Sequence, residues 1–269
     1  MEGKINDSKY GKIYYKVWDL DNPRLDLLII HGLGEHIERY NRFASYMAKA
    51  GVRCFGFDLP GHGKSDGKRG HIEKFNDIVK ITDDIIDIVK PKHLCLFGHS
   101  LGGLLASYVL LKSDNKLEKV IVSAPAFDLK SKVSRFLFPI MKLIRKAQPS
   151  FTTKNGISAK QLSHDKIIVK AYENDPLVHP YISISLFFEA IKAEEYCFAH
   201  FLDYKTPMLL VHGKEDSIVD KKCSEAFFNM LPHKGKTFKI IKDSYHEPHN
   251  ELNYVNNLKL YRDFLLTKQ

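Results

Sequence analysis

The segment LFGHSLGGLL, Leu96 to Leu105, constrains the fold of this chain more than any other feature. An apolar strand-like run, LCLFG, leads directly to the turn around Ser100, and an apolar helical pattern, LGGLLASYVLL, follows it. In the pattern G-x-S-x-G, a serine between a strand and a helix sits on a sharp turn that exposes its hydroxyl group. The segment therefore predicts a strand–turn–helix unit that presents Ser100 as a nucleophile.

The pattern G-x-S-x-G occurs a second time around Ser65, in PGHGKSDGKRG. The residues LPGHG separate Ser65 from the preceding strand pattern, and no helix pattern follows directly. We therefore expect a loop serine whose hydroxyl bonds to nearby backbone. A phosphate-binding loop, G-x-x-x-x-G-K-S, would need a glycine where Asp58 stands, so this segment does not predict ATP or GTP binding.

Short apolar runs alternate with helical patterns along most of the chain. The predicted strands are 12–18, 25–31, 52–58, 93–98, 119–124, 208–213 and 237–242. Most of them are rich in Ile, Val, Leu and Phe without polar alternation, which is typical of strands buried on both faces. The pattern predicts an α/β fold with an open, mostly parallel sheet and helices on both of its faces.

Residues 128–204 interrupt this alternation. Two apolar helical patterns, 134–147 and 184–202, flank a polar, turn-rich stretch, and we find no confident central strand. The segment is therefore predicted to be a helical cap inserted between two strands of the core. The core itself is predicted to comprise residues 1–127 and 205–269.

A serine nucleophile needs a carboxylate to orient the imidazole that activates it. The segment KEDSIVD follows the predicted strand 208–213, at the end of the chain's sixth strand pattern. Loops after later strands are the usual place for such an acid. We expect Asp216 to be this acid, with Asp220 and Glu215 as alternatives.

The imidazole itself should lie on the loop after the last predicted strand, where the chain reads DSYHEPHNEL. We expect His246 to be the base, with His249 as the alternative. Two backbone N–H groups would then form the oxyanion hole. The expected donors are the amides of Leu101, directly after the nucleophile, and Leu33, in the loop HGLGEH.

Six segments, in this order, carry a resemblance to a known family: HGLGEHIERY, FDLPGHGKSDGKRG, LFGHSLGG, VSAPAF, LLVHGKEDSIVD and YHEPHNEL. Together they resemble the monoacylglycerol lipase and lysophospholipase subgroup of the α/β-hydrolases. The likeness covers roughly residues 10–127 and 205–265. It implies the α/β-hydrolase fold and a serine esterase that cleaves monoacylglycerols to glycerol and fatty acid through an acyl-enzyme, with no cofactor and no metal.

The resemblance also implies residues that bind the substrate. Glu35 and Arg39 would hold the glycerol end, and His99 and His249 would belong to the same polar region. Fixed donors and acceptors beside the ester would discriminate a glycerol headgroup. Glu35 and Arg39 could equally form a structural ion pair that braces the oxyanion loop, and the two interpretations are compatible.

The first cap helix is apolar on too many sides for one buried face. Its apolar residues are Phe136, Leu137, Phe138, Ile140, Met141, Leu143 and Ile144, and its basic residues are Lys132, Arg135, Lys142, Arg145 and Lys146. This composition suits a helix that lines an acyl tunnel and makes peripheral contact with a membrane. Ordinary packing of the cap against the core is the alternative.

Composition narrows the functional classes further. The formal net charge of +9 is spread among acidic residues, and no nucleic-acid-binding module is present. The four cysteines form no C-x-x-C motif, which indicates a reducing compartment without zinc or disulfides. The N-terminus has no apolar signal-peptide region, so we expect a cytoplasmic protein.

Several alternatives to a monoacylglycerol lipase stay open. A lysophospholipase or a broad-specificity carboxylesterase would use the same three residues with a different cap. A carbon–carbon bond hydrolase and a cofactor-free peroxidase are less favoured. A non-catalytic lipid- or small-molecule-binding protein on a hydrolase scaffold is also less favoured, because such proteins often lose one of the three residues, and all three are present.

Overall fold

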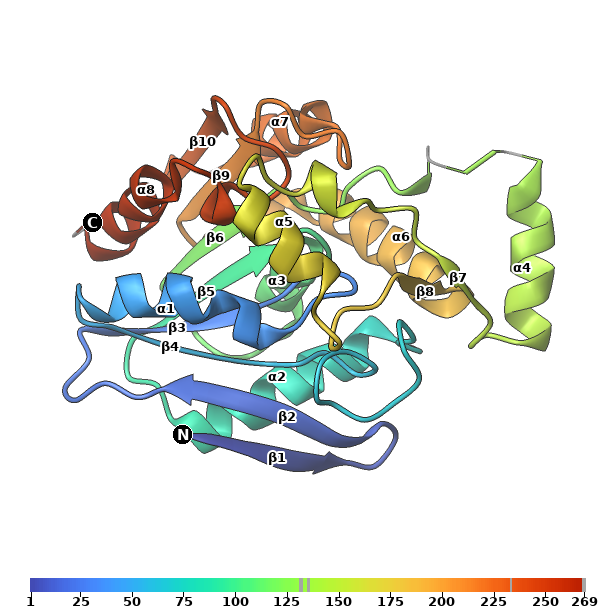
Figure 1. The fold of residues 1–269 in the computed structure, drawn as a ribbon, viewed down its shortest axis with the longest axis horizontal. Helices are drawn as coiled ribbons and strands as arrows, with labels where there is room; N and C mark the ends of the chain where they lie inside the picture. The colour runs from blue at the N-terminus through green and yellow to red at the C-terminus, as the bar shows by residue number, and fades with distance from the viewer. Residues whose placement is uncertain (131–132, 135, 233, 268–269) are drawn as a thin grey trace.

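The computed structural model describes residues 1–130, 133–134, 136–232 and 234–267, and a sheet of eight strands forms its centre (Figure 1). The strands are β1 (Glu2–Asp7), β2 (Gly11–Trp18), β3 (Leu25–Ile30), β4 (Val52–Phe57), β5 (Leu94–His99), β6 (Lys119–Ser123), β9 (Met208–Gly213) and β10 (Lys236–Ile241). Their order in the sheet is β1-β2-β4-β3-β5-β6-β9-β10. The pairs from β4 to β10 are parallel, whereas β1–β2 and β2–β4 are antiparallel.

Helices cover both faces of this sheet. They are α1 (Asn41–Ala48), α2 (Phe75–Val89), α3 (Leu101–Lys112), α6 (Ile184–Ala199), α7 (Lys221–Met230) and α8 (Tyr254–Leu266). One hydrophobic cluster joins the sheet to α1 and α8, and a second joins it to α2, α3, α6 and α7. Strands β3, β5, β6 and β9 are buried along their whole length, as strands covered on both faces should be.

The predicted α/β-hydrolase fold is confirmed, and each of the seven predicted strands matches an observed strand to within one residue at each end. Two elements were not predicted from the sequence. One is β1, an edge strand whose side chains alternate between exposed and half-buried. The other is α5 (Lys166–Glu173), a short helix without buried residues. Neither element carries the continuous apolar run on which the predictions depended.

The segment 128–204, called here the insertion, adds no strand to the central sheet in its described residues. It contains α4 (Leu137–Ala147), α5, α6, a small antiparallel pair β7 (Thr152–Lys154) and β8 (Tyr181–Ser183), and the 3-10 helices η3 (Ala159–Gln161) and η4 (Phe201–Asp203). Helix α6 packs on α3 and joins the core cluster, so the insertion is anchored on the sheet domain. The exact division into core and cap stays a prediction.

Helix α4 stands at one edge of the molecule (Figure 1) and has two different apolar faces. The residues that pack against α6 are Phe138, Met141 and Ile144. Leu137, Ile140 and Leu143 are instead 53%, 55% and 69% exposed. Lys132 and Arg135, predicted as part of the basic face of this helix, lie outside the described residues. Across the described part of the chain, no helix has the length and apolarity needed to cross a bilayer.

Candidate active site

Ser100 occupies a sharp turn between β5 and α3. Its backbone dihedral angles, φ 54° and ψ −118°, lie in a region that non-glycine residues rarely adopt. The Ser100 N–H donates to the carbonyl of Ser123 at 2.9 Å, which ties the turn to β6. A Cβ atom on Gly102 would lie only 2.1 Å from the carbonyl oxygen of Ile30, so α3 can start this close to β3 only with glycine there. The turn therefore holds the serine at the carboxyl edge of the sheet.

Ser65 has a different environment. Its buried hydroxyl donates to the carbonyl of Asp58 at 2.7 Å and accepts from the N–H of Tyr14 at 2.9 Å. These two backbone contacts confirm the prediction of a loop serine with a backbone-bonded hydroxyl. The second G-x-S-x-G pattern is thus a structural corner.

His246 and Asp216 lie together on neighbouring loops. His246 Nδ1 is 2.7 Å from Asp216 Oδ2, and the backbone N–H groups of Ile218 and Val219 donate to Asp216 Oδ1 at 2.8 and 3.1 Å. Burial alone would raise the pKa of Asp216, but His246 and His212 outweigh it and hold that pKa well below its usual range. Burial likewise opposes the charged form of His246, but the carboxylate of Asp216 raises the pKa of the imidazole above its usual value. The second nitrogen, Nε2, has no hydrogen-bond partner among the described residues.

The alternative acids and base lie elsewhere. Asp220 caps α7 by accepting from the N–H of Lys222 at 2.9 Å, and the half-exposed Glu215 lies 3.6 Å from His164. His249 stacks on Tyr40 with a ring separation of 5.2 Å. The structure therefore brings Asp216, of the three acids considered, to His246.

His212 is a site residue that the sequence analysis missed. Its Nε2 lies 3.0 Å from Asp216 Oδ2 and 3.1 Å from the carbonyl of Val219. Because that carbonyl can only accept, Nε2 carries the proton and His212 also donates to Asp216. Its Nδ1 lies 2.8 Å from the hydroxyl of Ser224, which fixes the ring. The available sequence signal was a histidine inside the apolar strand pattern MLLVHG, and the structure shows that this histidine is fully buried.

The predicted oxyanion donors belong to two segments that line one cavity together with Ser100. Leu101 is the first residue of α3, and Leu33 lies in the turn after β3. Within the described residues, neither backbone N–H donates a hydrogen bond to another backbone or side-chain group. Both amides are therefore free to bind an oxyanion.

Ser100 borders two spaces that differ in size and in the polarity of their lining. The first is a cavity of about 490 Å³, mostly apolar, whose lining includes Leu101, Met141, Ile182 and Phe187. The second, called here the polar chamber, is only about 10 Å³ in volume. Its lining residues are Gly32, Leu33, Glu35, Arg39, His99, Ser100, Ile157, Leu162, Tyr172, His246 and Glu247. Leu33, Ser100 and Ile157 border both spaces.

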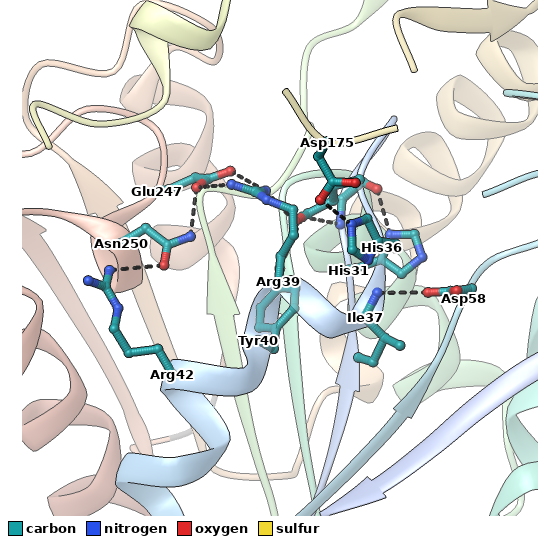
Figure 2. A network of polar contacts seen from close by, with 12 residues as sticks. His31, His36, Ile37, Arg39, Tyr40, Arg42, Asp58, Asp175, Glu247 and Asn250 are labelled. Atoms are coloured by element: carbon teal, nitrogen blue, oxygen red, sulfur yellow. Dashed lines mark hydrogen bonds and ion pairs between the residues drawn. The ribbon is translucent and has the colours of Figure 1, made fainter. Parts of the chain in front are cut away.

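An ion-pair network forms one wall of the polar chamber (Figure 2). Arg39 Nη1 lies 2.5 Å from Glu35 Oε2, and Glu35 Oε1 accepts from the N–H of Gly32 at 2.6 Å. Arg39 also donates to Glu247 through both terminal nitrogens, each at 2.8 Å. Glu35 and Arg39 thus brace the oxyanion loop and line the chamber at once. Glu247 was missed, although it directly follows His246 in the sequence.

The two other histidines predicted to bind substrate, His99 and His249, lie in different places relative to the polar chamber. His99 lines the chamber, whereas His249 does not line it and lies behind His99, with a ring separation of 4.8 Å. Burial lowers the pKa of His249 to about 3 and that of His99 well below its usual value, so both rings are neutral at pH 7.

Glu35, His99 and Glu247 form a group that a metal ion could use, because their potential ligand atoms lie within 4.8 Å of one another. Arg39 donates to both carboxylates of this group. The guanidinium of Arg39 already binds the carboxylate oxygens that a metal ion would need, and it supplies the positive charge that balances them. The donor set therefore fits an ion-pair network better than a metal site.

Comparisons with known proteins agree with this architecture. The Hydrolase_4 family model, described as serine aminopeptidase S33, matches residues 21–253. The structure of Paleococcus ferrophilus monoacylglycerol lipase superimposes with a TM-score of 0.87 and 33% identity, covering 94% of this chain and 98% of that one.

Two sequence relatives are also informative. Phospholipase YtpA of Bacillus subtilis is 29% identical, and the match covers 92% of this chain and 97% of YtpA. An uncharacterized abhydrolase domain-containing protein of Dictyostelium discoideum is 35% identical over 85% of this chain. This chain spans only 25% of the length of the Dictyostelium protein.

The chain belongs to the serine aminopeptidase S33 (Hydrolase_4) family of the α/β-hydrolases. Within this family it is a carboxylic ester hydrolase of the monoacylglycerol lipase-like subgroup. The resemblance drawn from its six sequence segments is confirmed at this level.

Proposed function

We propose that the protein hydrolyses the ester bond of monoacylglycerols, with Ser100, His246 and Asp216 as the catalytic triad. Ser100 attacks the ester carbonyl while His246 Nε2 takes its proton, and Asp216 orients the imidazole. The N–H groups of Leu33 and Leu101 stabilise the oxyanion. His246 then protonates the departing glycerol, and water activated by the same imidazole releases the fatty acid from Ser100.

The observation that carries this proposal is the position of Ser100 between the apolar cavity and the polar chamber. An ester of one acyl chain and a small polar alcohol has the same two-sided character. The cavity volume of about 490 Å³ lies within the range of small-molecule sites. Glu35, Arg39 and His99 of the chamber would face the alcohol, where fixed polar groups discriminate strongly.

The small size of the chamber has a consequence for glycerol binding. Its volume of about 10 Å³ is roughly that of one water site. Three of its lining residues, Ile157, Leu162 and Tyr172, come from the insertion. Binding and release of glycerol therefore require these residues to move outward.

The exposed face of α4 supports a peripheral contact with lipid. Leu137, Ile140 and Leu143 point away from α6, and Lys142 and Lys146 lie on the same helix. An apolar face flanked by basic residues suits the surface of an anionic membrane. Met141 of this helix also lines the acyl cavity, so docking of α4 would bring the cavity near its substrate.

Fatty-acid release from 1-monooleoylglycerol tests the proposal, with lysophosphatidylcholine and a diacylglycerol in parallel. We expect monooleoylglycerol to be the best substrate and Ser100→Ala to be inactive. Lysophospholipid hydrolysis is the competing candidate, favoured by the likeness to Phospholipase YtpA. Preference for lysophosphatidylcholine would support that candidate, and an inactive wild type would contradict both.

A further inference from the structure

Both terminal nitrogens of Arg39 are already used by carboxylates. Arg39 Nη1 and Nη2 form a bidentate ion pair with the carboxylate of Glu247, and Nη1 also donates to Glu35. The ring of Tyr172 covers a face of the same guanidinium, 4.8 Å away. The end-on edge of Arg39, formed by Nη1 and Nη2, is therefore not available to a ligand in the polar chamber.

Glu247 is held rigidly in this position. Asn250 donates to Glu247 Oε2 at 2.7 Å, and Arg42 in turn donates to Asn250 at 3.2 Å (Figure 2). The backbone N–H of Glu247 donates to the carbonyl of Leu162 in the insertion at 2.8 Å. These contacts fix Glu247, so its carboxylate cannot swing away without breaking several hydrogen bonds.

The charge of the chamber follows from this arrangement. Its described lining holds two carboxylates, Glu35 and Glu247, against the single guanidinium of Arg39. Burial alone would raise the pKa of Glu247, but the charge and hydrogen bonds of Arg39 outweigh it and hold that pKa well below its usual range. Burial, and the charge of Glu247, raise the pKa of Glu35 against the pull of Arg39. No positive charge is therefore left uncompensated along the described wall of the chamber.

We propose that Glu247 is a specificity-determining residue that restricts the leaving alcohol to uncharged groups. Glu247 forms a bidentate ion pair with Arg39 and so neutralises a guanidinium that could otherwise bind phosphate. The chamber therefore accepts a polyol and rejects a headgroup that carries phosphate. An arginine whose guanidinium has no carboxylate partner binds phosphate through bidentate hydrogen bonds, whereas buried carboxylates repel phosphate. This inference rests on the proposed ester hydrolysis and adds the charge class of its alcohol.

The test uses two substrates that differ only at the headgroup, 1-oleoylglycerol and 1-oleoylglycerol 3-phosphate, at equal mole fraction in uncharged detergent micelles. For the wild type, we expect kcat/KM to be about 100-fold lower for the phosphate substrate. In Glu247→Gln, which removes the carboxylate paired with both terminal nitrogens of Arg39, the ratio of kcat/KM for phosphate over neutral substrate should rise about 10-fold or more. Exposed Glu225 on α7 provides the control, because Glu225→Gln makes the same charge change outside the described chamber lining and should leave the ratio unchanged.

Two further variants test the mechanism. Glu247→Asp keeps the negative charge and should keep the discrimination, whereas the gain in Glu247→Gln should vanish in the double variant Arg39→Gln/Glu247→Gln. Labelling of Ser100 by an uncharged fluorophosphonate, with a thermal melt, reports whether each variant is folded.

The outcomes separate this inference from the proposed function. A folded Glu247→Gln enzyme with an unchanged ratio would overturn the inference. A wild type that cleaves both substrates at similar rates would also overturn it, and this result stands even if Glu247→Gln does not fold. A wild type that cleaves neither substrate would contradict the proposed function itself.

Discussion

The apolar cavity and the polar chamber meet at Ser100 but recognise a substrate by different physics. The cavity of about 490 Å³ has a mainly apolar lining, and burial in it is not directional. The chamber of about 10 Å³ is walled by charged groups whose hydrogen bonds are satisfied within the protein, as between Arg39 and Glu247. Selection of acyl chains should therefore be graded, whereas selection of the alcohol should be sharp, because a negatively charged headgroup would lie against the buried carboxylates of Glu35 and Glu247.

The largest expected effect comes from the acid of the proposed triad, which lines neither space but is needed for hydrolysis of a substrate that occupies both. Asp216→Asn would leave both spaces intact but allow the wrong tautomer of His246, so kcat should fall about 10⁴-fold. Asp220→Asn makes the same chemical change at the cap of α7 and should retain most of the activity. Steady-state hydrolysis of monooleoylglycerol measures both. Comparable losses in the two variants would show that the assignment of the acid is wrong.

The pH dependence of kcat/KM tests the pairing of His246 with Asp216. His246 must be neutral to accept the proton of Ser100, and Asp216 raises the pKa of His246 above the usual value of 6.5. As the pH falls through this raised pKa, kcat/KM should decline about tenfold per unit. The expected midpoint of the acid limb lies above 6.5 for substrates of any chain length. A midpoint below that value would contradict the coupling of His246 to Asp216.

A substitution on α4 can narrow the apolar cavity without changing the lining of the polar chamber. Met141→Trp places a larger side chain in the cavity lining and should lower kcat/KM for oleoylglycerol relative to butyroylglycerol about 10-fold. Ile140→Trp adds the same ring on the exposed face of the helix and should leave this ratio unchanged. Equal effects of the two variants would indicate that α4 acts through stability and that its inner face does not select the acyl chain.

The smallest expected effect concerns delivery of lipid to the cavity. Leu143→Glu places a charge on the exposed face of α4 and should reduce hydrolysis in anionic vesicles by about threefold to tenfold. Hydrolysis of a water-soluble butyrate ester by the same variant provides the control and should not change. A parallel loss on the soluble ester would rule out a specific role in membrane contact.

The sheet and the central elements of the site could be predicted because they depend on local patterns. Apolar runs identified seven strands, and the strand–turn–helix pattern separated Ser100 from Ser65, whose hydroxyl the structure shows bonded to backbone. The order of loops after the later strands led to Asp216 and His246, which the fold brings to 2.7 Å. Asp216 was preferred to Asp220 and Glu215 from the sequence, and the structure adds its contact with His246, which the two alternatives lack.

The alternation of strands and helices, the turn at Ser100 and the loops after the later strands are all visible in the amino-acid pattern, because these features arise from contacts between near neighbours in the chain. The surroundings of these elements depend instead on how distant segments pack together. Arg39 and Glu247 are 208 positions apart in the sequence, and nothing local in either segment shows that their side chains meet. The same holds for the place of His249 behind His99 and for the two apolar faces of α4. The direction of a buried side chain depends on which distant elements pack against it, and in this protein that packing creates the polar chamber.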